Sequence, residues 1–200
     1  MGEFFIKDVI LTIRTKSESD SVIREEAKKR GVSINSLINQ IFERYVITYR
    51  FIDSFPCLII PSEIITGWLD GMTEEHIIKI GKHAGSFVPK HSLFLSGATP
   101  NLDTILSTME KKVGQHSNWY QFQSQENNGK INLLLRHNLG RKWSTYLSAY
   151  YSALFEDILN ISIKFQIGDN SVAIMFPKTI KQSNGPEKVT NQIQNKNIKT

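Results

Sequence analysis

The chain has 200 residues, of which 40% are hydrophobic and 22% charged, and its formal net charge is +5. This apolar content excludes a wholly disordered chain, and the length fits one ordinary domain or two small ones. The single cysteine, Cys57, excludes an internal disulfide and is typical of a reducing compartment. Because the apolar runs are short and the first residues lack signal-peptide features, we expect a cytoplasmic protein without a membrane partner.

The charge is distributed unevenly along the chain. Residues 1–50 hold nine basic and seven acidic side chains, residues 51–177 hold ten and eleven, and residues 178–200 hold five lysines and one glutamate. The neutral middle indicates that a contact with a polyanion would come from the two ends. Since residues 178–200 also contain few apolar side chains, we predict a disordered basic tail there.

The first fifty residues predict one strand followed by two helices. Residues 9–15 alternate and are rich in β-branched side chains, which favours a strand. The serines at 17–21 open a helix that ends with Lys28-Lys29-Arg30 and Gly31, and Ser33 or Asn35 caps a second helix. The second helix carries one apolar stripe, formed by Leu37, Ile38, Ile41, Phe42, Tyr45 and Tyr49. A lone strand and an uncovered stripe cannot close a core, so we expect pairing with a second copy.

The order of strand, helix, Gly31-Val32-Ser33-Ile34-Asn35-Ser36 and helix resembles the ribbon-helix-helix repressors of the Arc/MetJ/CopG superfamily. The resemblance covers about residues 7–50, and it implies a DNA-binding and dimerisation domain. The two paired strands would enter the major groove of double-stranded DNA as a ribbon, in a homodimer or a dimer of dimers. The implied base contacts are Ile10, Thr12 and Arg14, and the implied phosphate contacts are Lys7, Lys16, Ser33, Asn35 and Ser36.

Residues 51–177 are numerous enough for an independent core, and their pattern predicts an α+β domain with an antiparallel sheet. A short buried strand is expected at 57–60, followed by a helix capped by Thr73 and another from Thr99-Pro100 to Gly114. Strands are expected at 119–125 and 130–136, joined by an Asn128-Gly129 turn. A helix at 140–159 and strands at 161–167 and 172–176 complete the domain.

One stretch of this domain joins a strand end to a helix start and carries several basic side chains. There, basic groups and free helix amides could hold an anionic effector, which makes this junction a candidate ligand site. Its residues are Arg136, His137, Gly140, Arg141, Lys142 and Trp143. The alternative is that Trp143 packs in the core while Arg141 and Lys142 are solvated.

Motifs for catalysis and for cofactors are missing from the sequence. It has no Gly-x-Ser-x-Gly and no phosphate-binding glycine loop, so we expect neither an enzyme nor a bound cofactor. His76 and His83 are seven residues apart without a cysteine beside them, so no metal site is expected. The sequence therefore predicts a sequence-specific, DNA-binding transcriptional regulator whose second domain senses a small molecule or oligomerises. An antitoxin-type DNA-binding protein and a metal-responsive regulator are the alternatives.

Overall fold

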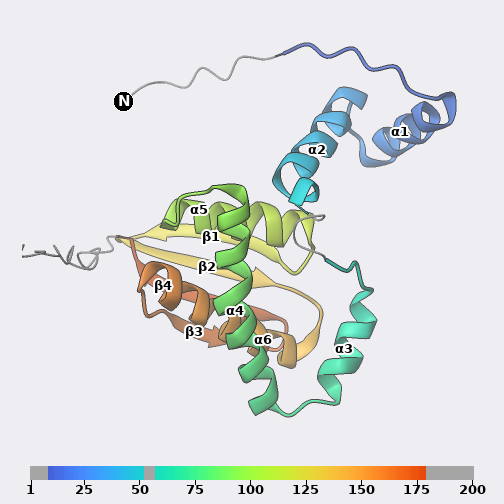
Figure 1. Ribbon diagram of the computed structural model, residues 1–200. Helices are drawn as coiled ribbons and strands as arrows, with labels where there is room; N and C mark the ends of the chain where they lie inside the picture. Colours follow the sequence, from blue (N-terminus) through green and yellow to red (C-terminus); the bar gives the residue numbers. More distant parts are fainter. Residues whose placement is uncertain (1–8, 52–56, 179–200) are drawn as a thin grey trace, which may run out of the picture. The chain divides into compact units, whose positions relative to one another are not determined.

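The computed structural model of the protein describes residues 9–51 and 57–178 (Figure 1). The chain divides into two compact units, which separate between Arg50 and Phe51. The N-terminal unit contains the helices α1 (Ser17–Arg30) and α2 (Ile34–Ile47), and the short 3₁₀ helix η1 (Tyr49–Phe51) spans the boundary. The C-terminal unit holds α3 (Ser62–Asp70), α4 (Glu74–Ser96), α5 (Leu102–Ser107), η2 (Thr108–His116), β1 (Gln121–Asn127), β2 (Lys130–Arg136), α6 (Gly140–Leu159), β3 (Lys164–Ile167) and β4 (Ser171–Pro177).

The two helices predicted for the N-terminal unit are confirmed, and local sequence explains their ends. Acidic side chains occupy the first turn of α1 and basic ones its last turn, which complements the helix dipole. Gly31 then ends α1 in the left-handed conformation, with φ of 67°. The hydroxyl of Ser33 begins α2 by accepting the backbone N–H of Ser36 at 3.0 Å.

The predicted N-terminal strand is wrong, and with it the resemblance to the ribbon-helix-helix fold. Residues 9–16 form no strand, and α1 is the first regular element of the described chain. A strand needs a neighbouring strand to satisfy its N–H and C=O groups, and no described segment pairs with residues 9–16. β-Branched alternation alone was therefore an insufficient signal. The proposed base-reading face loses its geometry, since Ile10, Thr12 and Arg14 are exposed outside any sheet.

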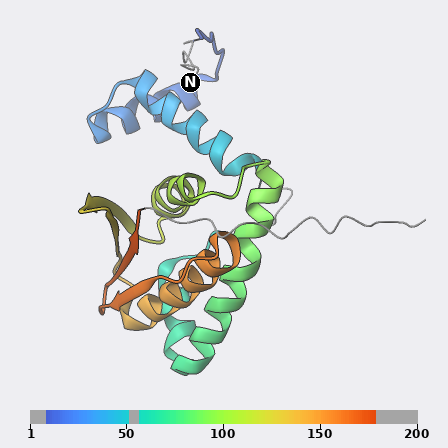
Figure 2. The same cartoon turned by 90° about the vertical axis from the view of Figure 1, so that its left-hand side faces the viewer.

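The C-terminal unit is α+β with an antiparallel sheet, as predicted. The four strands lie in the order β1-β2-β4-β3, and every neighbouring pair is antiparallel. Side chains alternate along β2, where Ile131, Leu133 and Leu135 are buried and the residues between them are not. Within the C-terminal unit the helices cover one face of the sheet, and no other described element of this unit covers the opposite face (Figure 2).

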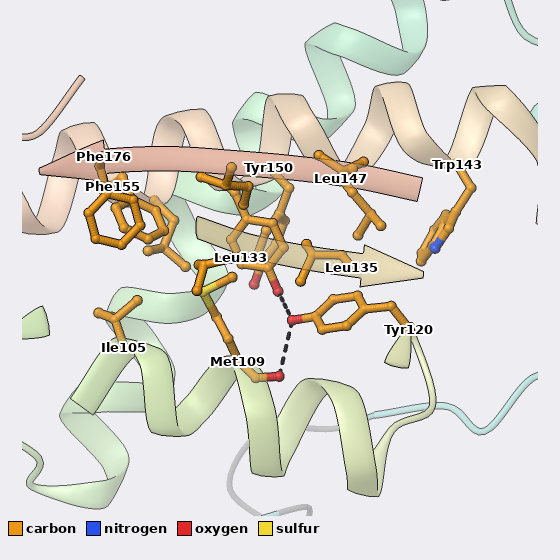
Figure 3. Close-up of a cluster of buried hydrophobic side chains, with 14 of the residues drawn as sticks. Ile105, Met109, Tyr120, Leu133, Leu135, Trp143, Leu147, Tyr150, Phe155 and Phe176 are labelled. Carbon is orange, nitrogen blue, oxygen red and sulfur yellow. Dashed lines mark hydrogen bonds between the residues drawn. The ribbon is translucent and has the colours of Figure 1, made fainter. Parts of the chain in front are cut away.

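Helix α6 forms the centre of the C-terminal unit. Eleven of its residues are buried, because it packs on the sheet through one side and on α4 through another. The contact with α4 is close because α4 places Gly81 and Gly85 against the backbone of α6. The core also contains Tyr120 and Tyr151, whose hydroxyl groups are hydrogen-bonded to each other (Figure 3).

Other elements of this unit also differ from the sequence prediction, since helix α3 is not expected and β3 begins at Lys164 rather than at residue 161. Residues 57–60 form no strand, and the side chains of Leu58 and Ile59 are 86% and 89% exposed, since no strand of the sheet reaches them. The helix expected after Thr73 continues to Ser96 with Pro89 inside it. The helix expected from Thr99-Pro100 to Gly114 begins instead after Asn101 and continues as the π-helix η2.

The described helices include none that is both long enough and apolar enough to cross a membrane. The predicted tail at 178–200 lies outside the described residues except for Lys178. Lys178 itself continues past β4, where its ammonium group pairs with the carboxylate of Glu126 at 2.8 Å.

Candidate ligand-binding pocket

The predicted anion site at the start of α6 is occupied by contacts within the protein. The ammonium group of Lys142 donates to the carbonyl oxygens of Leu69, Asp70 and Met72 at 2.9–3.0 Å. These carbonyls lie at the C-terminal end of α3 and just beyond it, so Lys142 fixes that end through hydrogen bonds and a favourable charge–dipole contact. Its charge is thus used to join α3 to α6.

Other members of the predicted anion site also have internal partners. The backbone N–H of Gly140 donates to the side-chain oxygen of Asn170 at 3.0 Å, which caps the start of α6. Trp143 is buried, and its indole N–H donates to the carbonyl oxygen of Trp119 at 3.2 Å. Arg141 is exposed and lies 3.6 Å from the carboxylate of Asp169. The structure therefore supports the alternative in which Trp143 belongs to the core.

His137 and Ser144 form a hydrogen-bonded pair that is structural rather than catalytic. The Nδ1 atom of His137 accepts the backbone N–H of Leu139 at 3.2 Å, so the ring proton lies on Nε2. That proton points to the Ser144 hydroxyl, whose oxygen is 2.9 Å away. A base that activates serine needs an unprotonated Nε2. Moreover Ser144 is fully buried, so a substrate cannot reach its oxygen.

Burial lowers the pKa of His137 below its usual value, because the charged imidazolium is poorly solvated there. The neutral ring is also the form that can accept the Leu139 amide. Unfolding therefore takes up a proton below the ordinary histidine pKa of about 6.5, and this group favours the folded state at higher pH. His137 accordingly stabilises the junction between β2 and α6 in its uncharged form.

Arg136 and His137 instead line a hollow of about 640 Å³ beside the start of β1 and the end of β2. The volume lies within the roughly 300–1,000 Å³ range of small-molecule sites. Its lining comes from η2, from the segment that leads into β1 and the first two residues of β1, and from the residues that end and follow β2. The lining residues are Glu110, Gly114, Gln115, Asn118, Trp119, Tyr120, Gln121, Phe122, Arg136, His137 and Asn138.

The π-helix η2 brings its side of the pocket close to the sheet. Gly114 is buried, and a β-carbon at this position would lie 3.2 Å from the carbonyl oxygen of Met109 and 3.4 Å from that of Tyr120. π-Helical turns occur frequently at functional sites. The sequence did not predict the η2 side of the pocket. Apolar spacing of three and four residues predicts an α-helix and carries no signal for the wider π-helical turn.

Trp119 connects the pocket to an aromatic cluster in the core. Its ring centroid lies 5.3 Å from that of Trp143 and 5.6 Å from that of Tyr150, both in edge-on orientation. Burial raises the pKa of the neighbouring Tyr146 to about 12. The phenol groups of this cluster are therefore neutral at ordinary pH and serve in packing. The polar groups that line the pocket belong to residues outside the cluster.

Of the residues predicted to contact DNA phosphates, Lys16 lies just before α1, and Ser33, Asn35 and Ser36 lie at the start of α2. Lys16 precedes α1 and is exposed, whereas Lys7 lies outside the described residues. The hydroxyl of Ser33 already accepts the Ser36 amide. The amides of Ile34 and Asn35, by contrast, have no acceptor within the described chain, as is typical of the first turn of a helix.

Within the described ranges, no group of three or more histidine, cysteine or acidic side chains is arranged to hold a metal ion. No protein-family model matches the chain, and comparison with curated proteins gives no match either.

Proposed function

We propose that the protein is a homodimeric DNA-binding regulator whose C-terminal unit binds a small effector. The observation that supports it most is the incomplete N-terminal unit, where Ala27 and Leu37 are the only buried side chains among the described residues 9–50. Two buried side chains cannot offset the conformational entropy lost by two helices, so this unit needs further apolar contact.

The surface of α2 offers that contact. Four large apolar side chains repeat along α2 and one follows in η1, and all five are exposed, with Tyr45 and Val46 the most exposed at 57% and 51%. The set is Ile41, Phe42, Tyr45, Val46 and Tyr49. A second copy presents the same stripe, and pairing through a twofold axis would bury both. This arrangement needs only the helices and does not involve residues 9–16.

The DNA contact is proposed at the turn between α1 and α2. Lys28 and Lys29 are exposed in the last turn of α1, whereas the guanidinium groups of Arg24 and Arg30 are paired with Asp20 and Glu26. The free amides at the start of α2 begin at Ile34, five residues after Lys29, so one short segment presents both charge and N–H donors to a phosphate. A dimer would double this set.

Fluorescence anisotropy with a labelled duplex of mixed sequence tests the proposal at about 50 and about 200 mM salt. We expect binding that weakens steeply as salt rises, because phosphate contacts release counterions. Replacing Lys28 and Lys29 by alanine removes four contacts per dimer. This change should reduce the slope of log K against log salt by about 3–4.

The matched control replaces Lys79 and Lys82, two exposed lysines on α4, and should leave binding unchanged. Sedimentation of the same samples measures the oligomeric state, which Tyr45→Ser combined with Ile41→Ser should shift to monomer. Absence of binding at low salt, or equal loss with the α4 control, would contradict the DNA proposal.

A further inference from the structure

Two opposite charges line the pocket beside β1 and β2 without meeting each other. Glu110 lies in the first turn of η2, and Arg136 ends β2. Both side chains are exposed, and neither makes an ion pair or a hydrogen bond within the described part of the chain. The pocket therefore keeps one cation and one carboxylate available on its walls.

The remaining lining suits a small molecule with a polar head and an apolar body. Four side-chain amides, from Gln115, Asn118, Gln121 and Asn138, can both donate and accept hydrogen bonds. Trp119 and Phe122 are half-buried and contribute apolar surface. Gln121 faces Arg136 directly across the β1–β2 pair, so an amide accompanies the guanidinium group.

We propose that this pocket binds a free amino acid, or a similar small zwitterion, with an apolar side chain. Its carboxylate would contact Arg136, its ammonium group Glu110, and its side chain Trp119 and Phe122. A simple anion would meet the carboxylate of Glu110, and a simple cation would meet Arg136. A neutral apolar ligand would displace water from both charges without replacing it. A ligand with both charges gives each of the two side chains an oppositely charged partner.

This inference rests on the effector-binding part of the proposed function and does not require DNA. Isothermal titration of the full-length protein with each standard protein amino acid tests it directly. The amino acid that binds most tightly is then compared with its amine, which lacks the carboxylate, and with its deaminated acid, which lacks the ammonium group. We expect each analogue to bind at least about tenfold more weakly, because one charge-assisted contact is lost and one wall charge is left unpaired.

Two variants assign the two contacts. Arg136→Gln should weaken amino-acid binding at least about tenfold while leaving the affinity for the amine unchanged. Glu110→Gln should weaken amino-acid binding to a similar extent while leaving the affinity for the deaminated acid unchanged. Lys130→Gln, at the opposite end of β2, and Glu156→Gln, exposed on α6, make the same charge changes outside the pocket and should have no effect.

The proposal is overturned if no amino acid binds, if the deaminated acid or the amine binds as tightly as the amino acid, or if the control variants weaken binding equally. DNA binding is measured separately on the ligand-free protein. A negative anisotropy result would therefore leave amino-acid binding intact, and a negative titration would leave DNA binding intact.

Discussion

At the scale of single residues, the tyrosine pair in the core of the C-terminal unit is a buried and fully hydrogen-bonded polar group. The Tyr120 hydroxyl donates to the carbonyl oxygen of Met109 at 3.1 Å, so the proton between the two phenols comes from Tyr151 (Figure 3). Burial raises the pKa of Tyr151 well above its usual value, which keeps it a neutral donor. The two hydroxyls are therefore unequal, because Tyr120 uses both its proton and a lone pair.

This inequality predicts an order of stability for the two phenylalanine variants. Tyr151→Phe leaves the bond from Tyr120 to Met109 in place and should cost about 1 kcal/mol of unfolding free energy. Tyr120→Phe leaves both the Tyr151 hydroxyl and the Met109 carbonyl without this partner in a dry core, and should cost about 2–4 kcal/mol. Urea unfolding followed by circular dichroism measures both. Equal losses, or a larger loss for Tyr151→Phe, would show that the donor order is reversed.

At the scale of elements, the packing of α4 on α6 depends on glycine. A β-carbon on Gly85 would lie 2.1 Å from the carbonyl oxygen of Tyr150, and one on Gly81 would lie 2.9 Å from the β-carbon of Ala149. Ile77, Gly81, Gly85 and Pro89 follow one another at four-residue spacing, and all are buried. The small residues let the two helix backbones approach each other, and this contact extends over much of both helices.

We therefore expect Gly85→Ala to destabilise the protein even though alanine favours helices. The propensity gain is about 1 kcal/mol, but the clash involves backbone that can move only if the helices separate. The net loss should be at least about 2 kcal/mol in thermal or urea unfolding. The control is Gly67→Ala in α3, where a β-carbon meets no atom within 4 Å. That substitution should stabilise by up to about 1 kcal/mol, and a loss at Gly67 equal to that at Gly85 would contradict the packing argument.

The elements also show which signals in the sequence were sufficient. Helix α6 was predicted over its whole length because its apolar stripe is long and continuous. The Asn128-Gly129 turn was predicted because few other residue pairs tolerate positive φ at both positions, and in the structure their φ angles are 51° and 69°. The strand expected at 9–15 failed because alternation says which side chains share a face but does not supply a partner strand. Strand formation depends on distant residues to a degree that helix formation does not.

The candidate pocket could be predicted only in part, for a related reason. Arg136 and His137 were identified because they belong to a basic stretch that joins a strand end to a helix start, where an anion could bind. Gly140 and Lys142 were grouped with them by sequence proximity, yet their partners, Asn170 and the end of α3, are at least thirty residues away. Glu110 and Gln115 carried no signal, since their position depends on the π-helical turn and on how it packs against β1.

At the scale of the whole molecule, the two units differ in how much core they contain. The buried cluster of the C-terminal unit runs from Leu69 to Phe176 and draws on helices and strands alike. The N-terminal unit buries one side chain from each of its helices. The C-terminal unit should therefore fold without residues 1–56, whereas residues 1–50 alone should fold only on association.

A fragment spanning residues 57–178 tests this independence. We expect it to be soluble and to unfold in one cooperative transition, with the mixed helix and strand spectrum of the C-terminal unit. A second fragment, residues 1–51, should gain helical signal as its concentration rises, because association supplies the apolar contact that its two helices lack within one chain. Thermal unfolding of both fragments is followed by circular dichroism over a hundredfold range of protein concentration, which changes the free energy available from association by about 2.7 kcal/mol. The stability of the 1–51 fragment should rise with concentration, whereas that of the 57–178 fragment should not. If the 57–178 fragment shows no cooperative transition, the first fifty residues must complete the core of the C-terminal unit. The apolar stripe on α2 would then contact the C-terminal unit of the same chain and not a second copy.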